Sequence, residues 1–170
     1  MSSTTETDFL KYLAPEYKQF KASPDLSDVV TLERKLGTAL WSIANPYKDG
    51  GWSFVVDDDP THRIRLGQDE NAYTAPEVPA RPDPGDATLS RRQYNEKQAE
   101  FREYCICTVQ CLKMLETVFI ILKRNHTEFG NYKPTFTVKD AFKYLKGRYV
   151  DEKDKRKAAF ALSLIHISEP

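Results

Sequence analysis

One long stretch without proline or glycine, from Thr88 to Arg124, constrains the fold of this chain more than any other feature. Apolar residues recur in it every three or four positions, which is the period of one face of an α-helix. Its first part, SRRQYNEKQAEFRE, alternates in charge as an exposed helix does. The pattern predicts one long helix over residues 88–124, or two joined end to end, with a buried second half. The predicted apolar face holds Tyr94, Phe101, Cys105, Leu112, Leu115, Phe119 and Leu122.

Two shorter segments have the same period. The first predicts a helix over residues 27–45, capped by Ser27 or Asp28 and ended by Asn45-Pro46, because proline disfavours helical geometry in the residue before it. Gly37 weakens the middle of this helix. The second segment begins with Thr137-Val-Lys-Asp, the pattern of a capping box, and predicts a helix over residues 137–147.

Between these helices the pattern changes twice. A turn at Lys48–Gly51 leads into WSFVV, and Ile64 and Leu66 alternate with arginines, which predicts a two-stranded β-ribbon over residues 52–66. Residues 74–87, TAPEVPARPDPGDA, contain four prolines and predict an extended spacer. Pro79 and Pro82 have the spacing of a PxxP ligand for an SH3-like domain, but no cluster of basic residues flanks them.

The fold class expected from these elements is mainly α: a helical bundle with one small ribbon and a proline-rich linker. We expect a flexible arm over residues 1–24, a helical domain over 25–150, a charged segment over 151–161 and a non-native tail over 162–170. The predicted core is Leu32, Leu36, Leu40, Trp52, Leu112, Leu115, Phe119 and Leu145.

The charge balance and the lengths of the apolar runs limit the classes of partner that the chain is expected to bind. Lys+Arg and Asp+Glu both total 25, so no net field draws the whole chain to nucleic acid or to a membrane. The longest apolar run, Val118–Leu122, is far below the roughly 20 residues of a membrane span. The N-terminus has neither the basic nor the apolar region of a signal peptide. We therefore predict a cytoplasmic protein without a membrane partner.

Candidate reactive groups are few. Cys105, Cys107 and Cys111 lack a fourth ligand or a nearby histidine for a zinc site, so we interpret them as small apolar residues of a helix. The aspartates at 57–59 are candidates for a divalent cation, but successive loop residues point in different directions and the following proline favours an exposed turn. We predict no catalytic residue, no cofactor, no metal and no small-molecule substrate, and hence no enzyme.

Basic residues gather near the C-terminus. Eight Lys or Arg stand against four acids between residues 139 and 157. This local excess of four positive charges predicts candidate contacts to nucleic-acid phosphates, although a solvated helix end gives the same pattern. The candidate residues are Lys139, Lys143, Lys146, Arg148, Lys153, Lys155, Arg156 and Lys157.

The order of segments resembles a known family. TLERKLGTALWSIANP, GGWSFVV, the proline-rich TAPEVPARPDPG, RRQYNEKQAEFREYCICTVQCLKMLETVF and TFTVKDAFKYLKGRYV are similar to the Gag-like reading frames of copia-type LTR retrotransposons of algae, diatoms and other protists. The resemblance spans about residues 25–150. It implies a structural protein whose helices self-assemble into a particle around the RNA of the element. Many members carry a zinc knuckle downstream, and its ligand spacing does not occur in this sequence.

Two functions therefore stand as hypotheses. The first is a Gag-like protein that forms homo-oligomers through helical faces and packages RNA. The alternative is a helical adaptor that binds one protein partner through the proline-rich spacer or the ribbon. The last nine residues, LSLIHISEP, resemble a translated sequencing adapter, so we expect native sequence to end near Ala161. The competing interpretation of the tail is a terminal strand.

Overall fold

The computed structural model describes residues 20–124 and 137–148. Most of the predicted arm lies outside these residues, as do the charged segment 151–161 and the tail 162–170. The predictions for these three segments therefore stay predictions.

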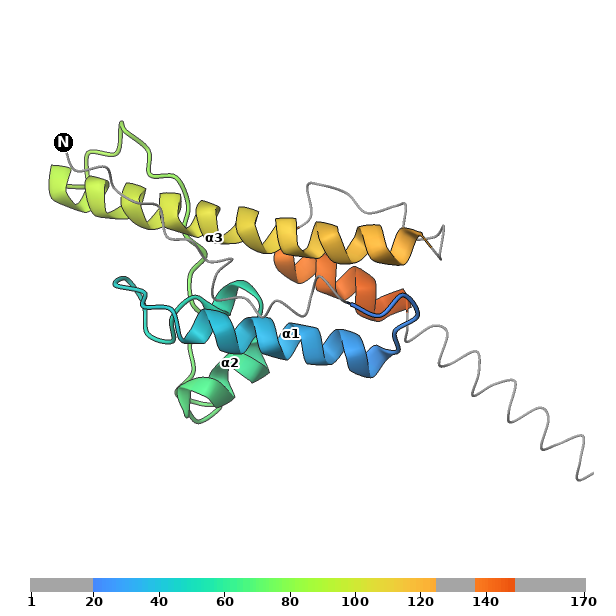
Figure 1. Cartoon of the computed structure of the whole chain (residues 1–170). Helices are drawn as coiled ribbons and strands as arrows, with labels where there is room; N and C mark the ends of the chain where they lie inside the picture. Colours follow the sequence, from blue (N-terminus) through green and yellow to red (C-terminus); the bar gives the residue numbers. More distant parts are fainter. Residues whose placement is uncertain (1–19, 125–136, 149–170) are drawn as a thin grey trace, which may run out of the picture.

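The described residues are mainly helical, as predicted. They form α1 (Leu26–Trp41), a short 3-10 helix η3 (Ser53–Val55), α2 (Asp59–Leu66), α3 (Arg91–Lys123) and a further helix over residues 138–148. Figure 1 shows α1 and α3 side by side and running in opposite directions, with the 138–148 helix against the second half of α3. The three helices predicted from the apolar period are thus confirmed, and their ends differ by a few residues.

The core lies where α1, η3, the second half of α3 and the 138–148 helix meet. Six of the eight predicted core residues are buried in it, and the other two, Leu32 and Leu112, are half-buried against it. The 138–148 helix contributes Val138, Ala141, Phe142 and Leu145. The face that α3 turns inward consists of Cys107, Cys111, Met114, Leu115, Val118, Phe119 and Leu122.

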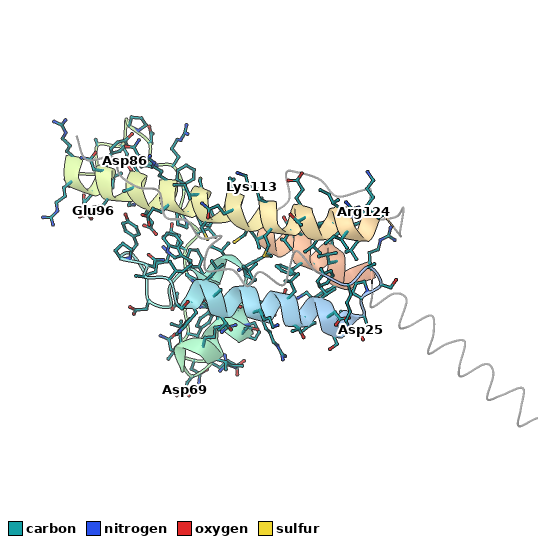
Figure 2. The ribbon with its side chains drawn as sticks, viewed as in Figure 1. Asp25, Asp69, Asp86, Glu96, Lys113 and Arg124 are labelled. Carbon is teal, nitrogen blue, oxygen red and sulfur yellow. The ribbon has the colours of Figure 1, made fainter. Side chains whose placement is uncertain are left out.

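Local hydrogen bonds set the helix ends. α1 is capped by Asp25 instead of the predicted Ser27 or Asp28, because the Asp25 carboxylate accepts from the Asp28 N–H at 2.9 Å and the Asp28 carboxylate accepts from the Asp25 N–H at 3.0 Å. Figure 2 labels Asp25 at this end of α1. α1 ends at Trp41, because the chain turns back and the Trp52 N–H donates to the Leu40 carbonyl at 2.9 Å. The capping box predicted at Thr137 and Asp140 is confirmed by both of its hydrogen bonds.

The predicted β-ribbon is wrong. Residues 53–55 form a 3-10 helix and residues 59–66 form α2, and no strand occurs in the described residues. Trp52 to Val56 are all buried, so consecutive side chains of this run enter the core, whereas in a half-buried strand every second side chain would be exposed. Asp58 caps α2 by accepting from the Thr61 N–H at 2.9 Å, and Pro60 stands in the first turn, where its missing N–H costs nothing. Ile64, the apolar residue between the two arginines of this segment, is 69% exposed.

The proline-rich segment lies along the first half of α3 (Figure 1). Residues 73–83 carry neither helix nor strand. Arg81 stacks over the Phe101 ring with its guanidinium carbon 5.9 Å from the ring centre, and Pro82 is buried. Lys48, in the turn after α1, pairs with Glu100 of α3 at 2.6 Å. These contacts anchor the first half of α3, which the central core does not reach.

By length and composition alone, α3 would be able to cross a membrane. Core helices of water-soluble proteins meet the same criterion, and the inward face of α3 is buried against the other helices. The absence of a membrane partner stays a prediction.

Candidate functional site

Half of the predicted basic residues lie in the described part of the chain, on the 138–148 helix. Lys139, Lys143 and Lys146 are spaced by four and three positions, so they share one face of the helix. Arg148 stacks over the Tyr144 ring at 5.9 Å and lies apart from this row. The remaining four candidates, Lys153, Lys155, Arg156 and Lys157, lie outside the described residues.

The three lysines line a groove of about 490 Å³. The 138–148 helix forms one wall, α1 contributes Glu33, and the segment before α2 contributes Val56 and Asp58. Val56 is almost fully buried. We call this site, lined by Glu33, Val56, Asp58, Lys139, Lys143, Lys146 and Gly147, the lysine groove.

The charges of the lysine groove are partly compensated. Lys146 pairs with Glu33, with its Nζ 2.9 Å from Oε2 and 3.1 Å from Oε1. Hydrogen bonds from the Thr61 side chain and N–H hold the pKa of Asp58 below its usual value, so this carboxylate stays ionised. Three lysines against two carboxylates leave one net positive charge. Lys139 and Lys143 are exposed, and neither forms an ion pair with another described residue.

This arrangement suits an anion that approaches from solvent. Lys146 is held in place by Glu33, whereas Lys139 and Lys143 can swing towards a ligand. Ammonium groups bind phosphate as point charges and do not require the fixed geometry of an arginine fork. Successive lysines one turn apart on a helix are about 5–6 Å from one another, a separation that successive phosphates of a nucleic-acid strand are able to match. The groove is therefore the best-formed candidate site for a polyanion in the described residues.

The three aspartates at 57–59 do not converge on one point. Asp57 is buried and faces Arg65, Asp58 caps α2, and Asp59 accepts from the Tyr73 hydroxyl at 3.4 Å. The expectation of an exposed turn is thus wrong for Asp57, which is only 4% exposed. Among the described residues, no three His, Cys, Asp or Glu side chains are placed to hold one metal ion.

A buried ion pair supports the wall of the lysine groove. The Arg65 Nε lies 2.7 Å from the Asp57 Oδ2, and the same guanidinium donates to the Thr38 hydroxyl at 3.0 Å and to the Arg34 carbonyl at 3.2 Å. Burial raises the pKa of Asp57, and the adjacent guanidinium opposes this rise. The pair fastens α2 to α1 directly beside Asp58.

His62 on α2 is another buried polar group outside the groove. It is 2% exposed, its Nδ1 lies 3.3 Å from the Tyr73 hydroxyl, and its Nε2 has no hydrogen-bond partner among the described residues. It borders an open cavity of about 400 Å³ between α2 and the segment after it. Burial is the main cause that lowers the pKa of His62, and the positive charge of Lys139 adds to this.

The lowered pKa of His62 predicts that stability falls in mild acid. The unfolded chain takes up a proton near pH 6.5 while the folded chain stays neutral, so the unfolding free energy decreases as the pH drops from 6.5 towards the folded pKa. The slope from this one group is at most about 1.4 kcal/mol per pH unit. Urea denaturation at pH 7.5 and 5.5 measures it, and His62→Gln should flatten the pH dependence. An equal loss of stability in both proteins would assign the effect to other groups.

The cysteines behave as apolar residues of α3. Cys107 and Cys111 are buried one turn apart, and Cys105 is half-buried. A hydrogen bond to Cys111, together with burial, raises the pKa of the Cys107 thiol far above its usual value. Cys107 is therefore held in its neutral, unreactive form.

Sequence patterns did not reveal the acidic residues of the lysine groove. Glu33 and Lys146 are 113 positions apart in the sequence, and no local sequence pattern predicts an ion pair between them. Asp58 had a usable signal, because an Asp just before Asp-Pro is typical of a helix N-terminus. Comparison of the chain with protein-family models, with curated proteins and with solved structures found no match.

Proposed function

We propose that this chain is a Gag-like structural protein that self-associates and packages RNA. The observation that carries the proposal is the lysine groove, in which two exposed lysines that form no ion pair with another described residue stand beside a third that is fixed by Glu33. The family resemblance described above agrees with such a role.

Self-association must use a face other than the apolar one expected from the sequence. The Gag-like hypothesis has copies of the chain associate through helical faces. In α3 the inward stripe is filled by α1, η3 and the 138–148 helix of the same copy. Any contact between copies must then use side chains that remain exposed after this core has formed.

The adaptor alternative receives less support. The ribbon, one of its two candidate binding surfaces, does not exist in the described residues. Of the PxxP prolines, Pro82 is buried and Pro79 is half-buried. An SH3-like domain would therefore have to pull the proline-rich segment away from the rest of the fold before it could bind both prolines. The neighbouring Arg81 is also engaged with Phe101.

The groove predicts a defined RNA-binding defect. Replacing Lys139 and Lys143 together by glutamine should weaken binding of a single-stranded RNA about tenfold at low salt. It should also reduce the slope of log affinity against log salt by about 1.4, the loss of two phosphate contacts. Fluorescence anisotropy with a labelled single-stranded RNA at several salt concentrations measures both quantities.

The matched control removes the same charge elsewhere. Arg91 and Lys97 are exposed residues of α3, and the Arg91→Gln/Lys97→Gln protein has the same net charge as the groove variant. It should keep most of its affinity. Equal losses in the two variants would show that RNA responds to net charge and not to the groove. Failure of the unaltered protein to bind RNA at low salt would remove the packaging function.

A further inference from the structure

The outward face of α3 carries an apolar and charged pattern that the core does not use. Val109 and Ile120 are 51% and 49% exposed, and the exposed Lys113 and Glu116 lie between them. At 100° per residue these four positions fall within an arc of about 60°. Figure 2 shows Lys113 on the side of α3 that faces away from α1. We call Val109, Lys113, Glu116 and Ile120 the outer stripe.

The outer stripe is complementary to itself when reversed. Turning α3 end for end about a point between Met114 and Leu115 exchanges Val109 with Ile120 and Lys113 with Glu116. A second α3 in that orientation would therefore place an apolar residue opposite each apolar residue and an opposite charge opposite each charge. A twofold contact requires this property, because the same patch must fit itself.

The residues beside the outer stripe continue the match. The same reversal places the half-buried Ile106 opposite Lys123 and Leu112 opposite Thr117. The aliphatic stem of a lysine covers apolar surface while its ammonium group stays in water. The reversed alignment thus opposes no two like charges over the span from 106 to 123.

From this complementarity we infer that α3 pairs with α3 of a second copy in antiparallel orientation through the outer stripe. Two Lys113–Glu116 pairs lie beside the twofold axis and fix the register of the interface, and two Val109–Ile120 contacts flank them. The inference deepens the self-association part of the proposed function and rests on it, since it names the surface. A twofold contact is closed, so the unit it forms is a dimer.

Charge reversal on the intact chain tests this pairing. Lys113→Glu and Glu116→Lys each oppose two pairs of like charges across the twofold axis, and each should weaken the dimer at least about tenfold in sedimentation equilibrium. An equimolar mixture of the two variants should recover dimers, because each heterodimer restores both opposite-charge pairs. Changes within a single copy do not produce this recovery. Val109→Glu should abolish dimers while the melting temperature stays within about 2 °C, since the residue is exposed.

The outcomes separate this inference from the proposed function. If the unaltered chain assembles with RNA and both reversals leave its self-association unchanged, the outer stripe is not the contact and the Gag-like function stands. If the mixture recovers dimers and the chain binds no RNA, the pairing stands and the packaging function fails. A chain that is monomeric at every concentration overturns the pairing, as expected if another segment of the same copy covers the stripe.

Discussion

Replacing Gly51 by alanine is expected to destabilise the fold by about 3–5 kcal/mol, a large effect for a single methyl group. Gly51 has φ +59°, a backbone conformation in which an added Cβ is strained. That Cβ would also collide with three backbone carbonyl oxygens at the end of α1, those of Leu40, Trp41 and Ile43. Backbone atoms held by a helix end cannot move aside as a side chain does. Urea denaturation monitored by circular dichroism measures the loss.

Gly67 provides the matched control. It ends α2 with φ +66°, close to the value at Gly51, and an added Cβ there would meet no atom within 4 Å. Gly67→Ala should therefore cost only the conformational strain, about 1–2 kcal/mol. If the two alanine variants lose the same free energy, the close approach of Gly51 to the end of α1 has no energetic weight.

The helices were predictable because their information is local. The apolar period of each helix is contained in one continuous segment. The capping box at Thr137 and Asp140 is recognised from four consecutive residues. The two glycines of Lys48–Gly51 predicted the turn there, and both adopt positive φ. The cap of α1 was misplaced by two or three residues, because Asp25, the aspartate that caps it, stands just before the apolar pattern.

The prediction of a β-ribbon was wrong because a short alternating pattern does not distinguish a strand from a helix. Arg-Ile-Arg-Leu alternates as a strand does, but four residues are too few to distinguish a strand from one turn of an exposed helix. The stronger signal was Asp58 before Asp-Pro, a helix N-terminus that fixes the chain direction after η3. The lysines of the lysine groove could be predicted from the sequence, because their spacing places them on one face of one helix. The position of Glu33 could not, because only the packing of α1 against the 138–148 helix brings it to Lys146.

Gly37 shows how a locally unfavourable residue is explained by a distant one. Glycine in the middle of a helix costs about 1 kcal/mol relative to alanine, and the sequence alone gives no reason for it. In the fold, an added Cβ at Gly37 would collide with the Asp57 carboxylate and lie 3.0 Å from the Arg65 guanidinium. The glycine therefore leaves the space in which the buried ion pair forms.

Removing the guanidinium from that ion pair should cost about 3 kcal/mol. Asp57 has 2% of its side chain exposed, and Arg65→Met would leave its carboxylate buried without a partner. Asp57→Asn in addition should recover part of the loss, because the buried group is then neutral. Chemical denaturation of the two single variants and of the double variant gives the coupling free energy between the two positions.

Arg63→Met is the matched control for this cycle, because Arg63 lies on the same helix and, among the described residues, donates a single long hydrogen bond, 3.4 Å, to the Gln68 carbonyl. It should change stability by no more than about 0.5 kcal/mol. A double variant whose loss equals the sum of the two single losses would mean that Asp57 and Arg65 act independently. In that case α2 would be held to α1 by other contacts, and the position of Asp58 in the lysine groove would not depend on the pair.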